Sequence, residues 1–475
     1  MTARADLAIV GAGPGGYVAA LRAAQLGLNV TLVEERALGG VCLNRGCIPT
    51  KAMLQTASLV HECRAAVASG LLTGSDIGVD YTAALQRRDL AVSRLTKGVA
   101  GLLRHAGVRV VAGHASFTGP NALAVTASGP GQAGDVAQEI DAGHIVVATG
   151  SRPAALPVPG GDHPQVIDSD GALALTEVPA RLLVVGGGAV GCEWTTIFSR
   201  LGSQVTLVEM LPSLLPREEP ELAAVLVRAL RQEVVTVHTS TSVLAVDATG
   251  GALQVTLSPE GTVKVDAVLV AAGRQPLTTG LDLDRAGVTT DSRGWILVDD
   301  YGRTNVPSIL AIGDVTGQAL LAHVASRQGI VAVEKLAGLS PAPVRKDRIP
   351  SVTFTDPEVA SAGLTEAEAR EQGVDVRVGR FPFSASGRAV ATGHETGLVK
   401  VVADARFDRV LGVHMVGAHV GELLAEAVLA LELESTLDEL TMVIRAHPTL
   451  SEAVGEAALA ATGNALHTVN QAAEK

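Results

Sequence analysis

One short pattern occurs twice in the chain and constrains the fold more than any other feature. Residues 6–10 are an apolar run, followed by Gly11-Ala12-Gly13-Pro14-Gly15-Gly16, a helical stretch and a second apolar run that ends in Glu34. Residues 181–185, Gly186-Gly187-Gly188-Ala189-Val190-Gly191 and Glu209 repeat the pattern, and in both copies the acid lies 23 positions after the first glycine. Strand, G-x-G-x-x-G turn, helix and acidic strand end are typical of a Rossmann-like dinucleotide-binding unit. The chain is therefore predicted to be an α/β protein with two such units.

Each position of the pattern has a physical role. The first glycine makes the tight turn, the second lets the backbone approach a pyrophosphate, the third packs helix on strand, and the acid accepts from ribose hydroxyls. The expected dinucleotide contacts are Gly11, Gly13, Gly16 and Glu34 in the first copy, and Gly186, Gly188, Gly191 and Glu209 in the second. Glu209 favours NAD over NADP, because a carboxylate repels a 2′-phosphate and no arginine follows in Met210-Leu211. A protein that binds two dinucleotides most simply moves electrons between them.

Two cysteines, Cys42 and Cys47, lie shortly after the first copy, in a stretch rich in glycine. As a structural disulfide this short loop would contribute only about 2 kcal/mol, which is little for a chain that can bury a large core. A bridge that opens and closes during turnover is the better interpretation. A helix is expected over residues 50–68, opened or kinked at Pro49, and its N-terminus together with the cation of Lys51 would favour a Cys47 thiolate.

The other cysteines and the overall charge exclude several classes of protein. No second cysteine pair or histidine cluster has ligand spacing, so no metal site is expected, and Cys63 and Cys192 are interpreted as small buried hydrophobes. With 37 Lys and Arg against 49 Asp and Glu the net charge is −12, and no basic patch indicates nucleic-acid binding. Apolar runs are too short for a membrane span, and four cysteines among 475 residues indicate a reducing, cytoplasmic location.

Further landmarks follow along the chain. An apolar run at 145–148 leads into Thr149-Gly150, and another at 309–312 leads into Gly313-Asp314, where a carboxylate can bind a polyol. Segments rich in Pro and Gly at 151–161 and 339–350 are predicted boundaries. Near the end, His447-Pro448 is followed by Glu452, a base and a carboxylate that could orient it. The limits expected for the domains are 1–152 with 273–348, then 153–272, then 349–475.

Taken together, these motifs resemble the flavin-dependent pyridine nucleotide–disulfide oxidoreductases along essentially the whole chain. The cysteine stretch reads Gly-Gly-Val-Cys-Leu-Asn-Arg-Gly-Cys-Ile-Pro-Thr-Lys, and the late motif reads His-Pro-Thr-Leu-Ser-Glu-Ala. Within the family these sequences are most similar to those of the dihydrolipoamide dehydrogenases.

The resemblance implies the cofactors and their contacts. The segments 1–152 and 273–348 would form an FAD-binding and central domain, 153–272 an NAD-binding domain, and 349–475 an α+β dimerisation domain. FAD would contact Glu34, Lys51, Gly113, Thr149, Gly150 and Asp314, with Ala322 and His323 along the isoalloxazine ring. NAD would lie on the second glycine turn and contact Glu193, Glu209, Val243 and Gly273.

The resemblance also implies a mechanism and partners. Cys42 would exchange with the substrate and Cys47 would face the flavin, while Lys51 and Glu193 are expected to pair beside it. His447, oriented by Glu452, would be the base, and in a two-fold homodimer it would complete the site of the partner subunit. The substrate partner would be a lipoyl domain or lipoylated acyltransferase of a 2-oxoacid dehydrogenase complex.

Two residues depart from the family pattern, and other functions stay open. Arg445 replaces a histidine that is not the base, with little expected effect, and Gln328 replaces an acidic residue, with no clear expected effect. The alternative enzymes are NAD(P)H-dependent reductases of glutathione, mycothiol or a similar disulfide. A structural subunit of a large complex is a further alternative, although it would have no need for the cysteines, Lys51 and the His447–Glu452 pair together.

Overall fold

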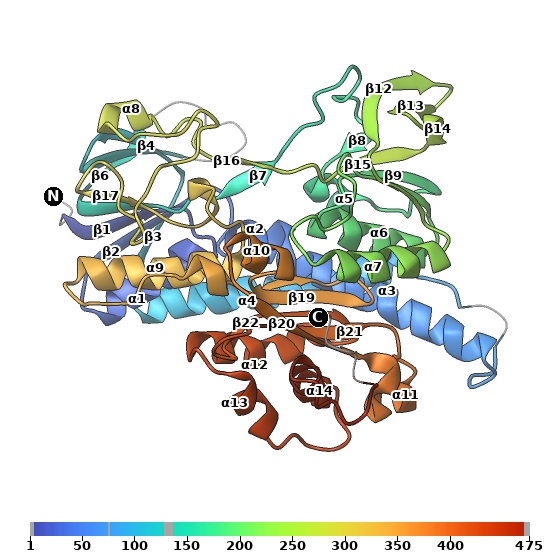
Figure 1. Cartoon of the computed structure of the whole chain (residues 1–475). Helices are drawn as coiled ribbons and strands as arrows, with labels where there is room; N and C mark the ends of the chain where they lie inside the picture. Colours follow the sequence, from blue (N-terminus) through green and yellow to red (C-terminus); the bar gives the residue numbers. More distant parts are fainter. Residues whose placement is uncertain (1–3, 75–76, 128–135, 470–475) are drawn as a thin grey trace.

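The first of three main sheets contains the N-terminal glycine turn. The computed structural model describes residues 4–74, 77–127 and 136–469, coloured along the chain in Figure 1. The side chains of Leu7, Ala8 and Ile9 are fully buried, as expected for a parallel strand covered on both faces. The parallel strands run in the order β3 (Arg109–Ala112), β2 (Val30–Glu34), β1 (Ala5–Val10), β6 (Val136–Val147), with β17 (Ile309–Ala311) also on β6. The start of β6 pairs antiparallel with β5 (Ala122–Thr126), and β5 pairs with β4 (His114–Gly119).

The second sheet repeats this plan. Its parallel strands run in the order β11 (Thr236–His238), β10 (Gln204–Val208), β9 (Arg181–Val185), β15 (Ala267–Val270), β8 (Val166–Ile167). An antiparallel meander again accompanies the sheet, formed by β12 (Ser242–Thr249), β13 (Ala252–Ser258) and β14 (Gly261–Val265). Between the two sheets, β7 (Ser151–Pro153) pairs with β16 (Arg274–Pro276) where the chain crosses from one to the other and back (Figure 1).

Helices join the strands and cover the sheets. In the first half they are α1 (Pro14–Gln25), α2 (Gly40–Arg45), α3 (Cys47–Ala68) and α4 (Tyr81–His105). In the second half they are α5 (Ser169–Ala174), α6 (Ala189–Leu201) and α7 (Pro220–Gln232), followed by α8 (Leu283–Ala286) and α9 (Ala322–Leu336). Helix α9 packs on α1, and α3 packs on both α4 and α6. The long helix α3 therefore connects the cysteine stretch to the second glycine turn's helix.

The third sheet is antiparallel and belongs to the C-terminal part of the chain. Its order is β18 (Ser351–Thr353), β19 (Glu358–Gly363), β22 (Val410–Gly417), β21 (Leu398–Asp404), β20 (Val376–Pro382). Helix α12 (Val420–Glu432) packs on β19 and β22, and α14 (Glu452–Ala461) packs on β20 and β21. The shorter helices are α10 (Glu366–Glu371), α11 (Gly387–Thr392) and α13 (Leu437–Met442).

A buried ion cluster ties the second sheet's layer to the third sheet. The ammonium of Lys400, on β21, lies 2.8 Å from both Glu219 and Glu221 and 3.0 Å from Glu366. Its side chain is only 2% exposed. Because Glu219 and Glu221 flank the start of α7, the helix is anchored to the C-terminal sheet by charges that water screens only weakly.

The predicted fold class is confirmed: two Rossmann-like α/β units are followed by a C-terminal α+β unit that matches a dimerisation domain. The predicted domain limits stay a prediction. The helix expected at 50–68 begins earlier, at Cys47, and Pro49 occupies its first turn, where no backbone donor is needed. Within the described ranges, no helix has the length and apolar character needed to cross a membrane.

Candidate active site

The third glycine of each turn lets a helix lie directly on the turn. A Cβ atom built on Gly16 would lie 1.8 Å from the carbonyl oxygen of Gly11, and one built on Gly191 would lie 1.8 Å from that of Gly186. Neither position has room for any side chain. The repeated geometry shows that both turns hold strand and helix at the same close distance, as the pattern predicts.

The second glycine of each turn faces open space instead. No atom lies within 4 Å of a Cβ built on Gly13 or on Gly188, and these residues are the N-caps of α1 and α6. Neither cap is satisfied by a side chain, so backbone N–H groups at both helix starts are available to an anion. Both turns therefore fit the pyrophosphate of a dinucleotide.

The two acids are held in matching positions. Glu34 accepts a hydrogen bond of 2.6 Å from the Ala12 N–H, and Glu209 accepts one of 2.6 Å from the Gly187 N–H. Each carboxylate thus bonds to the residue between the first two glycines of its own turn. The bond fixes the carboxylate at the end of its strand, beside the open face of the turn, where ribose hydroxyls would lie.

Cys42 and Cys47 lie on two consecutive helices and differ in the acidity of their thiols. Cys42 is on α2 and half-buried, Cys47 begins α3 and is exposed, and both are free thiols. Hydrogen bonding from Cys42 and the Lys51 ammonium lower the pKa of Cys47 to about 7, although surrounding protein groups partly desolvate the sulfur and oppose this shift. The same hydrogen bond, together with burial, raises the pKa of Cys42. In the reduced pair, Cys47 is therefore the thiol that ionises first, while Cys42 keeps its proton.

The predicted ion pair between Lys51 and Glu193 is confirmed. The Lys51 ammonium lies 2.8 Å from the Glu193 carboxylate, which is 6% exposed, and Lys51 is one turn of α3 beyond Cys47. Glu193 also accepts a 3.0 Å hydrogen bond from the Phe354 N–H. The pair bridges α3 and α6 beside the cysteines.

A cleft of about 730 Å³ gathers many of the predicted site residues. Its lining includes Gly11, Gly13, Glu34, Cys42, Cys47, Lys51, Gly113, Thr149, Gly150, Glu193, Asp314 and Ala322. The glycines of the second turn and Glu209 are not part of this lining. Among the described residues, the predicted site residues that lie outside the lining are Gly16, Gly186, Gly188, Gly191, Glu209, Val243, Gly273, His323, His447 and Glu452. The ring of His323 instead lies 2.9 Å from the Pro350 carbonyl oxygen.

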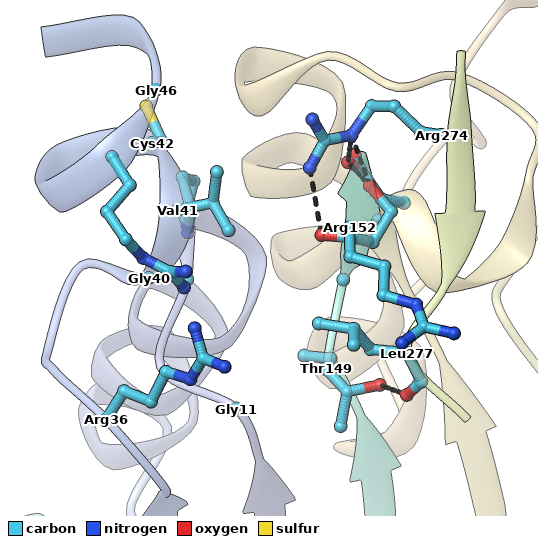
Figure 2. Close-up of a pocket in the computed structure, with 18 of the residues that line it drawn as sticks. Gly11, Arg36, Gly40, Val41, Cys42, Gly46, Thr149, Arg152, Arg274 and Leu277 are labelled. Atoms are coloured by element: carbon cyan, nitrogen blue, oxygen red, sulfur yellow. Dashed lines mark hydrogen bonds and ion pairs between the residues drawn. The ribbon is translucent and has the colours of Figure 1, made fainter. Parts of the chain in front are cut away.

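The cleft also contains polar residues that the sequence analysis did not select. Ser151 donates a 2.5 Å hydrogen bond to Asp314 and accepts one of 2.6 Å from Arg274. Arg36 and Arg152 extend from opposite walls of the cleft, as Figure 2 shows. Their positive charges suit a pyrophosphate. Ser151 and Arg152 directly follow the predicted Thr149-Gly150 turn, and their polar character after a buried strand is the signal that could have identified them.

The comparisons with known proteins agree with this geometry. Residues 5–329 match the pyridine nucleotide-disulphide oxidoreductase family, and residues 349–458 match the dimerisation domain of that family. The chain belongs to the pyridine nucleotide-disulphide oxidoreductases. Membership confirms an oxidoreductase with FAD and NAD as cofactors, and the dimerisation domain supports a homodimer.

Individual members of the family are similar over nearly the whole chain. A dihydrolipoyl dehydrogenase of Thermus scotoductus is 46% identical over 473 residues, covering 98% of this chain and 99% of the relative. The mitochondrial dihydrolipoyl dehydrogenase 1 of Arabidopsis thaliana is 42% identical over 468 residues, covering 97% and 91%. The solved Cu(II) complex of RclA, an HOCl-induced flavoprotein disulfide reductase of Escherichia coli, has a TM-score of 0.86 at 29% identity, covering 96% and 99%.

In this pyridine nucleotide-disulphide oxidoreductase, His447 and Glu452 form a pair on the surface of the C-terminal unit. His447 Nδ1 lies 2.9 Å from a Glu452 oxygen, and the His447 side chain is 78% exposed. The pKa of the Glu452 carboxyl is below its ordinary value. Burial raises this pKa, but hydrogen bonds from the Thr449 N–H and the His447 ring together lower it by more. An ionised Glu452 accepts from Nδ1–H and leaves Nε2 of His447 as the free acceptor.

The two departures from the family pattern have structural explanations. Gln328 accepts a 2.8 Å hydrogen bond from the Gly313 N–H through its amide oxygen, a contact that a carboxylate would also make. The Arg445 guanidinium forms an ion pair with Glu426 and donates to the Leu440 carbonyl at 3.0 Å, so it is directed into the C-terminal unit. Cys192 is fully buried, as predicted, and burial raises the pKa of its thiol. Cys63 was also predicted to be buried but is only half-buried. Among the described residues, no cluster of three or more His, Cys, Asp or Glu could hold a metal ion.

Proposed function

We propose that this oxidoreductase is a dihydrolipoyl dehydrogenase, which oxidises protein-bound dihydrolipoamide to lipoamide and reduces NAD⁺ to NADH. The observation that carries the proposal is the Cys42–Cys47 pair, which lines the same cleft as the first glycine turn, with Lys51 one helical turn beyond Cys47. Full-length identity of 42–46% to dihydrolipoyl dehydrogenases supports the choice of substrate. The first unit would hold FAD through Gly11, Gly13, Glu34, Gly113, Thr149, Gly150, Asp314 and Ala322, and the second would hold NAD through its glycine turn, Glu209, Val243 and Gly273.

The thiol chemistry follows from the geometry. In the oxidised enzyme Cys42 and Cys47 form a disulfide, and a substrate thiolate attacks the Cys42 sulfur. Cys47 leaves as a thiolate, which its low pKa and the Lys51 cation stabilise. The second substrate thiolate then attacks the substrate sulfur that is bound to Cys42. This attack closes the lipoamide disulfide and releases the Cys42 thiolate, and Cys42 then takes up a proton. The substrate has lost two electrons and the cysteine pair has gained two. Bound FAD would supply the step that carries these electrons to NAD⁺ as a hydride.

Deprotonation of the substrate requires a base. His447 has a free Nε2 once Glu452 fixes Nδ1–H, which is the arrangement of a base with its orienting carboxylate. Proton removal from each substrate thiol generates the thiolates that the exchange needs. Replacement of such a base typically costs about 10²- to 10⁴-fold in rate.

One assay separates this function from the alternative disulfide reductases. We expect rapid NAD⁺ reduction by dihydrolipoamide and little NADPH oxidation with glutathione disulfide or a mycothiol disulfide. The Cys63→Ser variant should match the parent, because Cys63 is outside the cleft lining. Faster turnover of NADPH with a low-molecular-weight disulfide would refute the proposed substrate, and no turnover in any assay would favour a structural subunit.

The proposal includes a shared active site in the homodimer. His447 is highly exposed on the C-terminal unit and, among the described residues, is not part of the cleft lining that contains the cysteines. In a two-fold dimer, each site would join the cysteines of one subunit to the His447–Glu452 pair of the other. An isologous interface makes both sites equal.

Mixing inactive subunits tests this arrangement. Cys42→Ala and His447→Ala proteins should each be inactive, but after dissociation and reassociation about half of the dimers are mixed and each has one intact site. About a quarter of parental activity should therefore return. A mixture of Cys42→Ala with Cys42→Ala,His447→Ala is the matched control and should stay inactive. If mixed dimers are present and no activity returns, histidine and cysteines act within one chain.

The proposed physiological partner is a lipoyl domain or lipoylated acyltransferase of a 2-oxoacid dehydrogenase complex. The His447 side chain is 78% exposed, so a substrate tethered to another protein could reach it. A cytoplasmic location is also part of the proposal, since a reducing compartment keeps such a thiol pair cycling.

A further inference from the structure

Phe354 contacts both members of the Lys51–Glu193 ion pair. It follows β18 in the C-terminal unit, and its N–H donates a 3.0 Å hydrogen bond to Glu193. Its ring lies beneath the Lys51 ammonium, which is 4.6 Å from the ring centroid. An aromatic face attracts a cation at this distance. One residue of the C-terminal unit thus binds the carboxylate through its backbone and the ammonium through its side chain.

The position of Phe354 is fixed by its neighbours. Two residues later, Asp356 forms a 2.9 Å ion pair with Arg200, whose side chain is only 3% exposed. Arg200 lies on α6, the same helix as Glu193. The Phe354 ring also packs on the apolar core that α3 and α6 share, which includes Met53, Leu54 and Trp194. The ring is therefore held in register with the ion pair.

We propose that Phe354 is a positioning residue for the redox cysteines, holding the Lys51 ammonium at a defined place between Cys47 and Glu193. The inference rests on the proposed role of Cys47 as the thiolate of the pair. No part of the family match assigns a role to this ring.

The electrostatics of Cys47 explain why the position matters. The Lys51 cation lowers the pKa of the Cys47 thiol and the Glu193 anion raises it. The other titratable group that faces Cys47 is Cys42, on α2, and Tyr17, on α1, faces Cys42. Without the ring, the ammonium is free to move toward the solvent side of Glu193, away from Cys47. The thiolate then loses part of its stabilisation, and the pKa of Cys47 rises.

The test measures Cys47 directly. In the flavin-loaded Cys42→Ser protein, a Cys47 thiolate beside the oxidised flavin should give a long-wavelength absorbance band whose pH midpoint reports the thiol. Adding Phe354→Leu should move that midpoint upward by about half a pH unit or more, which is about a threefold change in the thiolate-to-thiol ratio. Phe354→Tyr keeps the ring face and should leave the midpoint in place. If Phe354→Leu does not fold, Phe354→Met is the replacement of similar volume.

Two controls identify the cause of the shift. Phe407 also stacks with a cation, the Arg406 guanidinium at 4.8 Å, but it is 63% exposed elsewhere in the C-terminal unit. Phe407→Leu should therefore leave the midpoint unchanged. Lys51→Met by itself should raise the pH midpoint of the band. Adding Phe354→Leu to Lys51→Met should then cause no further shift, because the ring acts through the ammonium.

An unshifted midpoint in a well-folded, flavin-loaded Phe354→Leu protein would overturn the role of Phe354, and so would a shift that persists in the Lys51→Met background. Neither result depends on the substrate, because the band reports the thiol whatever disulfide the enzyme accepts. Failure of the dihydrolipoamide assay would refute the proposed function and leave this inference standing.

Discussion

The two nucleotide-binding units share one turn and differ in the connection that comes after it. In both units, the third glycine of the turn lies against the first, and the second glycine faces open space. The acid at the strand end accepts a hydrogen bond from the residue between the first and second glycines. After that acid the units diverge. The connection from β2 to β3 contains α2, α3 and α4 with Cys42 and Cys47, whereas the connection from β10 to β11 contains α7. The nucleotide site is thus a constant scaffold, and the reactive groups are supplied by the connection between its strands.

The largest expected effect is in the connection that differs. Cys42→Ser and Cys47→Ser should both reduce dihydrolipoamide-dependent NAD⁺ reduction to background, because thiol–disulfide exchange needs both sulfurs. Absorbance separates the two. Cys42→Ser leaves the Cys47 thiolate and should show the long-wavelength band without reductant, while Cys47→Ser should not. The opposite pattern would reverse the assigned roles of the two sulfurs.

A smaller effect should come from breaking only one of the two turns. Gly191→Ala places a Cβ 1.8 Å from the Gly186 carbonyl oxygen, so it should displace the second turn alone. We expect the purified variant to keep its flavin and to lose on the order of 100-fold in NADH-dependent activity, or about 2.7 kcal/mol. Gly16→Ala should instead be purified without flavin.

Gly98→Ala on α4 is the matched control, because no atom lies within 4 Å of the added methyl group. It should keep both flavin and activity. If Gly191→Ala lost its flavin, or Gly16→Ala kept it with full activity, the two units would not be the independent sites that their geometry indicates.

The smallest effect concerns the choice of nucleotide at Glu209. Glu209→Arg removes the carboxylate that repels a 2′-phosphate, so the ratio of NADH to NADPH efficiency should fall by about tenfold, or about 1.4 kcal/mol. Part of the fall will be lost NADH efficiency, because Glu209 also holds the Gly187 N–H. The same charge change at exposed Asp247 in this unit should not alter the ratio. A parental enzyme that used NADPH equally well would refute the role of Glu209.

Local sequence patterns predicted most of the scaffold. The apolar runs at 6–10 and 181–185 form the strands β1 (Ala5–Val10) and β9 (Arg181–Val185), as their sequences predict. Helix α2 was not predicted, because Gly39, Gly40 and Gly46 begin and end its short sequence and glycine has weak helical propensity. A glycine is needed at position 40, where a Cβ would be 2.6 Å from the Gly13 Cα of the first turn.

Contacts between segments that are distant in the sequence could not be predicted from local sequence patterns. Nothing in the sequence near Phe354 indicates that its ring lies under Lys51, and nothing near Arg274 indicates a bond to Ser151. These contacts depend on how separate units pack, for which a single sequence provides no periodic signal. Lys51 and Glu193 were predicted to pair only through the family resemblance, and the structure confirms the pair.

The buried Lys400 cluster limits how the enzyme can open. Its ion pairs cross from α7 to the C-terminal sheet, and Lys400 is 2% exposed. A hinge motion that swung the second unit away from the sheet would have to break this cluster in every turnover. We therefore expect entry and release of the pyridine nucleotide to involve small movements of side chains and loops, with the cluster intact.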